Sequence, residues 1–455
     1  MKKQTVSPCY QSCNPYTETI EEVFPFVAEE DVRRALHRLE HGTKAWRNVP
    51  IMQRLDTLKT IRHKLEIGRD RYAALMCSEM GKPIQQGCAE IDKCIQLCEY
   101  YFENTTHMLA SYSPLRLDPL GVILGIMPWN FPFWQVFRFA VPVLMIGNAV
   151  LIKPAENTPQ SALAICDIFR ETGIANTTFD TLFLSHNQTE DVIAHPAIQG
   201  ISLTGSAKAG RHISALAGKH LKKTVLELGG SDPFIVCEDA NLDAAVSAAH
   251  TSRFLNSGQT CIAAKRFLIH HSLFQAFSKA LEKRMAKDQL GNPINPKTSI
   301  GPLARKDLLK TLEKQVKSSL EMGATCLFQH KNLDFKTGFF YPPTLLSDVS
   351  PSMPVFQEEV FGPVAVVCPF EDDTEAIRLA NQTCYGLGAS VWTSSRERAS
   401  HYISNIETGS LFVNAIVKSS PELPFGGVKA SGYGRELGQE GLSSFANLKT
   451  VVTHF

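Results

Sequence analysis

The segment Gly200-Ile-Ser-Leu-Thr-Gly-Ser-Ala-Lys-Ala-Gly210 joins a short apolar strand pattern to a glycine-containing turn and the start of a helix. We predict that helix over about residues 208–216, and a further strand over residues 224–228. A strand, a helix and a second strand in succession are typical of parallel sheets covered by helices on both faces. The segment therefore predicts an α/β fold with a doubly wound sheet.

The same alternation continues on both sides of this segment. Residues 29–109 carry apolar residues at helical spacing, and we expect several amphipathic helices there. A second α/β unit is expected from residue 233 to about residue 429, so Gly229-Gly230 lies near the boundary between two units. The other elements that we predict are strands over residues 121–126, 149–152, 266–269 and 364–368 and helices over residues 161–172, 273–287 and 374–380.

Length and charge narrow the classes of function. A chain of 455 residues favours two or three domains, and 46 basic against 45 acidic side chains give no electrostatic reason to expect a nucleic-acid or membrane partner. The N-terminus lacks the apolar region of a secretory signal, so we expect a cytoplasmic protein. The apolar run over residues 131–152 is interrupted by prolines and by Arg138, which disfavours a transmembrane helix.

The 12 cysteines show no repeated spacing, which disfavours a disulfide framework and a zinc cluster. His37, Glu40 and His41 match the spacing of some zinc peptidases. They fall on a short amphipathic helix with no third ligand nearby, so we interpret them as a solvated helix face. We therefore expect no metal site.

Two segments carry candidate catalytic groups. In Asn256-Ser-Gly-Gln-Thr-Cys261 a thiol follows a polar, glycine-containing turn, and in Glu227-Leu-Gly-Gly230 a carboxylate precedes two glycines that backbone or ligand can approach closely. The plain interpretations are a small buried hydrophobe for Cys261 and a strand end for Glu227. Together, however, the two segments predict a nucleophile and a base.

Two further segments lie where α/β sheets bind dinucleotides. Residues 204–210 join a strand to a helix, where backbone N–H groups could hold a phosphate, although the turn lacks both the P-loop ending and the three-glycine spacing. Lys153 and Glu156 follow the strand over residues 149–152, and a carboxylate there would repel a ribose 2′-phosphate, which favours NAD over NADP. An ordinary turn and a solvated loop are the alternatives.

Residues 128–132 and 357–363 are the last candidates. Asn130, between two prolines, has an amide that could donate to a developing oxyanion, whereas Glu359 and Phe361 offer a carboxylate and an aromatic ring near a turn. In isolation Asn130 would be an ordinary turn residue, and the other two a surface acid and a core ring.

Taken together, these segments resemble the aldehyde dehydrogenase superfamily from Asn14 to the C-terminus. Seven segments occur in the order that the family has. They are residues 128–132, 153–156, 204–206, 227–230, 258–261, 359–363 and 424–427. The residues that flank these segments are most similar to those of the short bacterial NAD-dependent succinate-semialdehyde dehydrogenases.

The resemblance implies a Rossmann-like cofactor domain, an α/β catalytic domain and a small bridging element that builds homodimers or homotetramers. The expected bounds are residues 1–110 and 120–229 for the cofactor domain, 230–429 for the catalytic domain, and 111–119 with 430–455 for the bridging element.

The resemblance also assigns roles. Cys261 would attack the aldehyde carbonyl to give a thiohemiacetal, and Asn130 with the Cys261 N–H would hold the oxyanion. Glu227 would activate water for hydrolysis of the resulting thioester, so the product is a free carboxylic acid. NAD is the expected cofactor, with NADP as an alternative. The expected cofactor contacts are Ile126, Trp129, Lys153, Glu156, Gly205, Ser206, Leu228, Glu359 and Phe361.

For the substrate, Arg138 aligns with an arginine that binds a distal carboxylate in related semialdehyde dehydrogenases. An internal salt bridge is the alternative for Arg138. A second arginine of some relatives is replaced here by Leu255, so we hypothesise that Lys418 supplies the second charge, with a solvated lysine as the alternative. A general aliphatic or aromatic aldehyde dehydrogenase, or a non-catalytic member of the fold, remains open.

Overall fold

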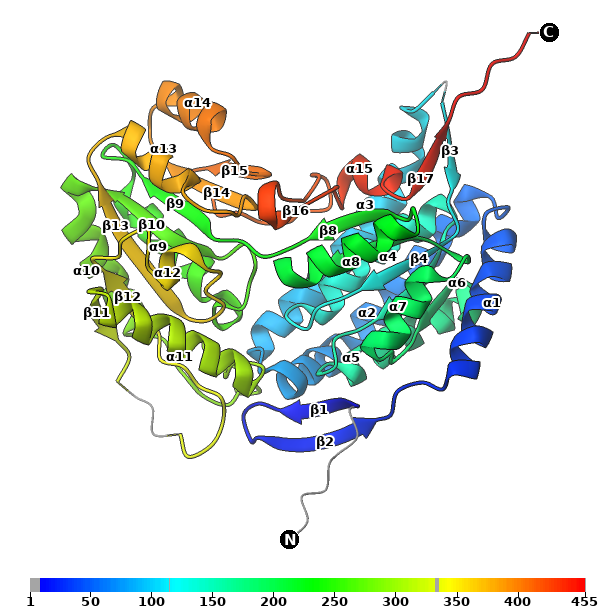
Figure 1. The fold of residues 1–455 in the computed structure, drawn as a ribbon, viewed down its shortest axis with the longest axis horizontal. Helices are drawn as coiled ribbons and strands as arrows, with labels where there is room; N and C mark the ends of the chain where they lie inside the picture. Colours follow the sequence, from blue (N-terminus) through cyan, green and yellow to red (C-terminus); the bar gives the residue numbers. More distant parts are fainter. Residues whose placement is uncertain (1–8, 114, 332–334, 455) are drawn as a thin grey trace.

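The computed structural model describes residues 9–113, 115–331 and 335–454, and it places them in two α/β units and two small sheets (Figure 1). Residues 1–8, 114 and 455, which fall within the expected cofactor domain and bridging element, lie outside the described residues, as do residues 332–334. The doubly wound α/β fold expected from the sequence is confirmed.

The first unit is built on a six-stranded sheet in the order β16-β8-β7-β4-β5-β6. Neighbouring strands are parallel except for β16, which pairs antiparallel with β8. The carboxyl ends of the parallel strands therefore meet at one edge of the sheet, where such folds bind ligands. The strands are β4 (Val122–Ile126), β5 (Ala149–Lys153), β6 (Phe179–Thr181), β7 (Ile198–Thr204), β8 (Lys223–Glu227) and β16 (Gly432–Tyr433).

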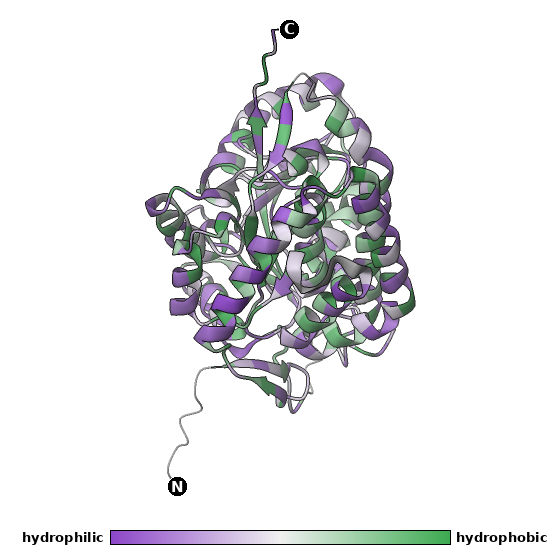
Figure 2. Ribbon diagram, turned by 90° about the vertical axis from the view of Figure 1, so that its right-hand side faces the viewer, coloured by the Kyte–Doolittle hydropathy of each residue, from purple (hydrophilic) through white to green (hydrophobic). Residues whose placement is uncertain are grey.

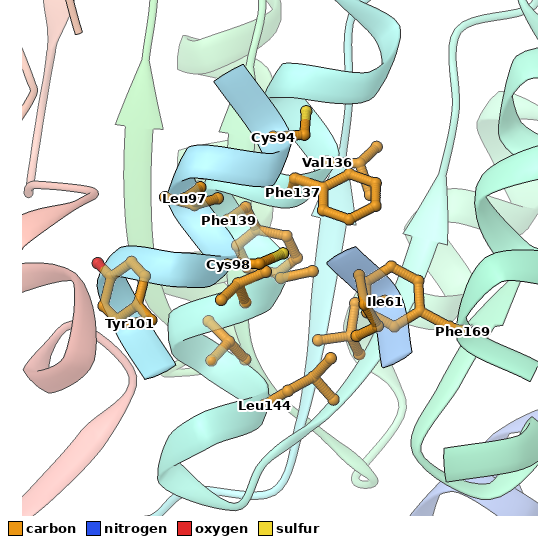
Figure 3. Packing of buried hydrophobic residues seen from close by; sticks show 14 of the residues in the cluster. Ile61, Cys94, Leu97, Cys98, Tyr101, Val136, Phe137, Phe139, Leu144 and Phe169 are labelled. Atoms are coloured by element: carbon orange, nitrogen blue, oxygen red, sulfur yellow. The ribbon is translucent and has the colours of Figure 1, made fainter. Parts of the chain in front are cut away.

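Helices cover both faces of this sheet, because alternate strand residues are apolar on opposite sides. Ile123 of β4 packs into a cluster with α2 to α5, whereas Val122 and Leu124 pack with α1, α7 and α8. Figure 3 shows part of the first cluster, where Phe137 and Phe139 of α4 meet Cys98 and Leu97 of α3. The helices are α1 (Glu29–Trp46), α2 (Ile51–Met80), α3 (Ile84–Ala110), α4 (Pro132–Ile146), α5 (Pro159–Phe169), α6 (Ala175–Thr178), α7 (His186–Ala194) and α8 (Ala207–Lys219).

The apolar run noted in the sequence forms α4, a helix in which every residue is buried. Pro142 lies inside it, and Gly147 ends it with a positive φ of 108°. Among the described residues, no helix has the length and apolar character needed to cross a membrane. Surface helices instead alternate hydrophilic and hydrophobic residues (Figure 2).

The second unit has a seven-stranded sheet in the order β11-β12-β13-β10-β9-β14-β15. Helices α9 and α10 pack on one face, and α11 to α14 pack on the other. The strands are β9 (Asp232–Val236), β10 (Ala264–His270), β11 (Thr325–Gln329), β12 (Thr344–Ser347), β13 (Val364–Phe370), β14 (Gly388–Trp392) and β15 (Ser410–Val413). The helices are α9 (Leu242–Phe254), α10 (Phe274–Met285), α11 (Lys306–Glu321), α12 (Pro354–Gln357), α13 (Asp373–Asn381) and α14 (Arg396–Asn405).

Two antiparallel sheets of two strands each complete the structure. Strand β1 (Tyr10–Asn14) pairs with β2 (Thr19–Phe24), and β3 (Arg116–Pro119) pairs with β17 (Ala446–Lys449), next to α15 (Gly438–Ser443). The pairing of β3 with β17 joins the two pieces expected to form the bridging element, although the assembly of subunits stays a prediction. Residues 432–433 differ from that expectation, because β16 extends the six-stranded sheet of the cofactor unit.

Candidate active site

The turn before Cys261 has an unusual backbone. Asn256, Ser257 and Gly258 have φ values of 54°, 54° and 75°, so three consecutive residues adopt the left-handed region. A Cβ on Gly258 would collide with the carbonyl of Gly362, so only glycine fits there. This turn lies in the short segment Leu255–Gly258 that follows α9, and it directs the chain toward the thiol.

Arg253, fully buried at the end of α9, holds this turn in place. Its guanidinium donates to the carbonyls of Gly258 at 2.8 Å, Gly362 at 2.6 Å and Val360 at 3.2 Å. The turn that carries Cys261 and the segment that carries Phe361 are thereby fixed to each other. The desolvation of a buried charge is offset by these hydrogen bonds.

The surroundings of Cys261 disfavour the thiolate form of its side chain. Burial raises its pKa to about 12, whereas the cations Arg138 and Lys265 oppose the rise. Lys265 is itself buried and donates to the Cys261 carbonyl at 2.8 Å and the Ala263 carbonyl at 3.2 Å. Nucleophilic attack therefore requires that a proton be removed from the thiol as the reaction proceeds.

Asn130 lies against the same turn. Its amide Nδ2 donates to the Gln259 carbonyl at 3.1 Å, and Asn256 Nδ2 donates to the Asn130 carbonyl at 2.9 Å. An amide nitrogen has two hydrogens, so the second hydrogen of Asn130 remains for an oxyanion. Asn130 is therefore in contact with the turn before Cys261, and its role as an oxyanion donor stays a prediction.

The segment before α4 is anchored by a buried acid. Glu90 of α3 accepts from the backbone N–H groups of Phe133 and Trp134, both at 2.9 Å, at the N-terminus of α4. Lys82 pairs with Glu90, and its ammonium lies 3.8 Å from the centre of the Phe131 ring. A carboxylate at a helix N-terminus is stabilising, and here it fixes the turn from which Asn130 projects.

Glu227 ends β8 at the point where the chain leaves the six-stranded sheet and enters β9 of the other unit (Figure 1). The side chain is 2% exposed, and neither carboxylate oxygen has a hydrogen-bond partner among the described residues. Burial raises the pKa of Glu227 well above its ordinary value; Arg138 opposes the rise and Glu436 adds to it. A buried carboxyl group without partners is suited to exchange a proton with water or substrate.

Arg138 has partners inside the protein. Its guanidinium is buried on α4, forms an ion pair with Glu436 and donates to Thr204 Oγ1 at 3.3 Å. Because Glu436 already supplies a carboxylate, the structure favours the alternative, an internal salt bridge. Arg138 lowers the pKa of both Cys261 and Glu227, so its charge acts on the two catalytic candidates.

The expected cofactor contacts gather at the carboxyl edge of the six-stranded sheet. Ile126, Lys153 and Leu228 lie at or just after the ends of β4, β5 and β8. Gly205 and Ser206 lie between β7 and α8, where Ser206 Oγ accepts from the Ala209 N–H at 3.2 Å. A Cβ on Gly205 would meet only Leu203 Cδ1, at 3.7 Å, so space beside the helix N-terminus is open to a phosphate.

Glu359 and Phe361 reach this edge from the other unit. Glu359 Oε1 accepts from the Gly230 N–H at 3.1 Å, and a Cβ on Gly229 would lie 2.5 Å from its other oxygen. Phe361 and Trp129 form an edge-to-face pair with centroids 5.6 Å apart. A carboxylate just after β8 and a pair of rings just after β4 fit a ribose and a flat heterocycle, so the residues present fit a dinucleotide.

Lys153 and Glu156 differ in exposure. Lys153 is 7% exposed and its ammonium lies 5.3 Å from the centre of the Tyr10 ring, whereas Glu156 is exposed and lies 3.7 Å from His186 Nε2. Burial lowers the pKa of Lys153, and the Glu156 carboxylate opposes that change. Lys153 ends β5 and Glu156 lies in the turn that follows, and the contacts of both with the adenosine ribose stay a prediction.

Lys418 is exposed in the loop after β15, and its role in binding the substrate stays a prediction. The neighbouring residue Ser419 is buried, and its Oγ accepts a hydrogen bond from Lys93 Nζ at 2.8 Å. Sequence reasoning did not single out Lys93, Arg253, Lys265 or Glu436. Of these four residues, only Glu436 could have been found from the sequence, because it follows closely on the family segment of residues 424–427.

Known proteins are similar to this chain over almost its whole length. The model of the aldehyde dehydrogenase family matches residues 2–451. A Synechocystis sp. protein named "Probable succinate-semialdehyde dehydrogenase [NADP(+)]" is 44% identical, covering 96% of this chain and 98% of its own. A Mycobacterium bovis protein named "Succinate-semialdehyde dehydrogenase [NADP(+)] 1" is 42% identical with the same coverage. The solved succinic semialdehyde dehydrogenase of Streptococcus pyogenes, in complex with NADP+, has a TM-score of 0.94 and 34% identity, and covers 98% of this chain and 99% of its own.

Proposed function

We propose, from the premise that this chain belongs to the aldehyde dehydrogenase family, that it oxidises succinate semialdehyde to succinate with a nicotinamide dinucleotide. The observation that carries the proposal is the arrangement of Cys261, Asn130 and Glu227. Asn130 contacts the turn before Cys261, and the charge of Arg138 acts on both Cys261 and Glu227. A thiol, an amide donor and an unpartnered acid are the groups that two-step aldehyde oxidation requires.

In the first step, the Cys261 thiol passes its proton to solvent water as the sulfur attacks the aldehyde carbon, and the C=O π bond opens to an oxyanion. The second amide hydrogen of Asn130 and the Cys261 backbone N–H donate to the oxygen as it gains charge, and one such donor contributes about 2.7–4 kcal/mol. A nicotinamide dinucleotide held at the carboxyl edge of the six-stranded sheet would supply the acceptor for the hydride of this carbon. Cys261 then carries a thioester.

In the second step, Glu227 takes a proton from water, and the hydroxide formed attacks the thioester carbon. The carbon–sulfur bond breaks, Cys261 leaves as thiolate, and the carboxylic acid departs. Over the whole reaction, aldehyde, water and oxidised dinucleotide would give a carboxylic acid, reduced dinucleotide and one proton. Glu227 has no hydrogen-bond partner among the described residues that would compete for this water.

The substrate and the choice of dinucleotide rest on two further supports. The relatives from Synechocystis and Mycobacterium bovis are named for succinate semialdehyde and NADP(+), and the Streptococcus pyogenes enzyme was solved with NADP+. Those names favour NADP, whereas the exposed carboxylate of Glu156 would repel a 2′-phosphate and favours NAD. We propose NADP as the main cofactor, with Glu156 limiting the preference. A cytoplasmic location and a homodimer or homotetramer are also proposals.

The test measures the absorbance of reduced cofactor with succinate semialdehyde or butyraldehyde at matched concentrations, using NAD+ and NADP+ in turn. We expect a higher kcat/KM for succinate semialdehyde and no turnover by Cys261→Ser. Equal or faster oxidation of butyraldehyde would contradict the substrate and leave a general aldehyde dehydrogenase. Absence of turnover with every aldehyde would contradict the activity itself.

A further inference from the structure

A polar cavity of about 540 Å³ lies next to the amino ends of β4 and β5. Its wall contains Pro119, which precedes β4, and Ile146, which ends α4 shortly before β5 begins. The expected dinucleotide contacts lie at the opposite, carboxyl ends of the same strands. Each strand has five residues, so roughly 15 Å of sheet separates the two places. The cavity therefore belongs neither to the catalytic candidates nor to the expected cofactor site.

The cavity carries an excess of positive charge. Of its described lining residues, four are basic and one is acidic. They are Lys44, Arg47, Arg54, Arg116 and Asp118. The acid is already shared, because Asp118 pairs with Arg116 at 2.7 Å and with Lys449 at 2.5 Å. It therefore does not neutralise the cations that remain.

Arg54, in the first turn of α2, is the buried cation of this set. The residue is 8% exposed, and its guanidinium has neither a hydrogen-bond acceptor nor a carboxylate partner in the part of the chain that the structure describes. Buried Arg253, in contrast, donates to several backbone carbonyls. Burial lowers the pKa of Arg54, with no nearby acid to oppose the change. A desolvated guanidinium is unfavourable unless an anion supplies the missing acceptors.

The turn after α4 fixes the position of this guanidinium. A Cβ on Gly147 would lie 2.6 Å from Arg54 Nη1 and 3.2 Å from Arg47 Cα, so a larger residue would displace the two arginines. The end of α4 does not supply the missing acceptor, because the Leu144 carbonyl accepts from Trp46 Nε1 at 2.8 Å. The start of α2 and the end of α1 thus meet at Gly147, with both arginines lining the cavity.

We propose that this cavity binds a small, multiply charged anion of the phosphate type, with Arg54 as its anchor and Arg47 at its rim. A guanidinium group matches two oxygens of a phosphate with two parallel hydrogen bonds. The volume lies within the range of about 300–1,000 Å³ that small-molecule sites occupy, so a phosphate monoester fits as well as inorganic phosphate. The site is independent of the oxidation of aldehydes, and the anion supplies the acceptors that Arg54 lacks.

Isothermal titration calorimetry with inorganic phosphate and with pyrophosphate, at constant ionic strength, tests this site. We expect Arg54→Met to weaken binding by about 10- to 100-fold, because hydrogen bonds between charged groups are lost. Arg47→Met should weaken binding less, since Arg47 is exposed. Arg71→Met is the matched control, because it removes an exposed arginine from the same helix, and it should bind as the wild type does. Tighter binding of pyrophosphate would identify a phosphate ester or diphosphate as the ligand, and equal binding would identify free phosphate.

Thermal unfolding separates a ligand-binding Arg54 from a structural one. Without an anion, Arg54→Met should unfold at the wild-type temperature or above it, because a buried charge without a partner is removed. With phosphate well above its Kd, the Tm of the wild type should rise and that of Arg54→Met should not. A structural Arg54 would give a variant that is less stable at every phosphate concentration and that phosphate stabilises as much as the wild type.

Three results would overturn the site. The first is the absence of phosphate binding by the wild type. The second is binding that persists unchanged in both Arg54→Met and Arg47→Met, which would place the anion at another site such as the turn at Gly205. The third is loss of subunit assembly in Arg54→Met, measured by light scattering, without phosphate binding by the wild type, which would assign the cavity to a subunit contact. Arg47→Met decides the matter if Arg54→Met does not fold.

Discussion

Arg138 and Glu436 form an ion pair in the interior, with side chains that expose only 2% and 4% of their surface. Glu436 is also held by Ser202 of β7, whose hydroxyl donates to it at 2.8 Å. The same guanidinium lowers the pKa of Cys261 and of Glu227. One ion pair thus connects the central sheet with the nucleophile and the base.

Removal of either member of this pair leaves an uncompensated buried charge. Glu436→Gln and Arg138→Met should each lower the free energy of unfolding by about 3–5 kcal/mol. The double variant should lose less than the sum, because both charges leave together. Urea unfolding of the three variants measures this coupling, and additive losses would show that the two groups do not act as a pair.

Glu227→Gln should slow thioester hydrolysis more than thioester formation. We expect a burst of reduced cofactor of about one equivalent per active site, followed by a steady rate about 10²–10⁴-fold below the wild type. Rapid-mixing absorbance measures both phases. A uniform loss of both phases would mean that Glu227 also takes the proton from Cys261.

The pH profile of the wild type follows from the same acid. Burial raises the pKa of Glu227 well above its ordinary value, and only the ionised carboxylate can take a proton from water. The steady-state kcat should therefore fall as the pH decreases through that raised pKa, which lies above the range of exposed carboxyl groups. Glu227→Gln should lack this limb, and an unchanged limb in the variant would assign it to another group.

The sequence predicted the parts of this architecture that depend on local patterns. Strands over residues 121–126 and 149–152 are short runs rich in branched residues between turn signals, and they occur within one residue of the predicted bounds as β4 and β5. The helix predicted over residues 161–172 instead ends at Phe169 and continues as a π-helical turn, Arg170–Ile174. The two-residue strand β16 could not be predicted from local sequence, because only its pairing with β8 defines it as a strand.

The site divides in the same way. Cys261, Glu227 and Asn130 lie in short motifs, so their candidate roles could be predicted from the sequence. The contact of Lys93 with Ser419 could not be predicted, because a lysine beside Asp92 on an amphipathic helix is typical of a solvated face. Its environment depends on Ser419, which is 326 residues away in the chain.

Glu156→Ser should shift the cofactor preference toward NADP+. The wild-type carboxylate is exposed at the end of β5 and would repel a 2′-phosphate, whereas a serine hydroxyl can donate to it. We expect the ratio of kcat/KM for NADP+ to that for NAD+ to rise by about tenfold or more, which corresponds to roughly 1.4 kcal/mol. Glu190→Ser, which removes another exposed acid that contacts a histidine, is the control. An unchanged ratio would place the 2′ position away from Glu156.

Gly258→Ala should disturb the turn that presents Cys261. A side chain at φ 75° is strained, and its Cβ would collide with the Gly362 carbonyl and lie 2.6 Å from Arg253 Nη2. We expect the free energy of unfolding to fall by about 2 kcal/mol or more. The turnover rate should also fall, because Arg253, which the new side chain would displace, holds the segment that carries Phe361. Gly218→Ala is the control: its Cβ would meet nothing within 4 Å, and alanine in a helix should stabilise α8 by about 0.5–1 kcal/mol. Thermal unfolding and steady-state kinetics of the pair decide the matter, and equal behaviour of the two variants would show that the left-handed turn is not required to position the thiol.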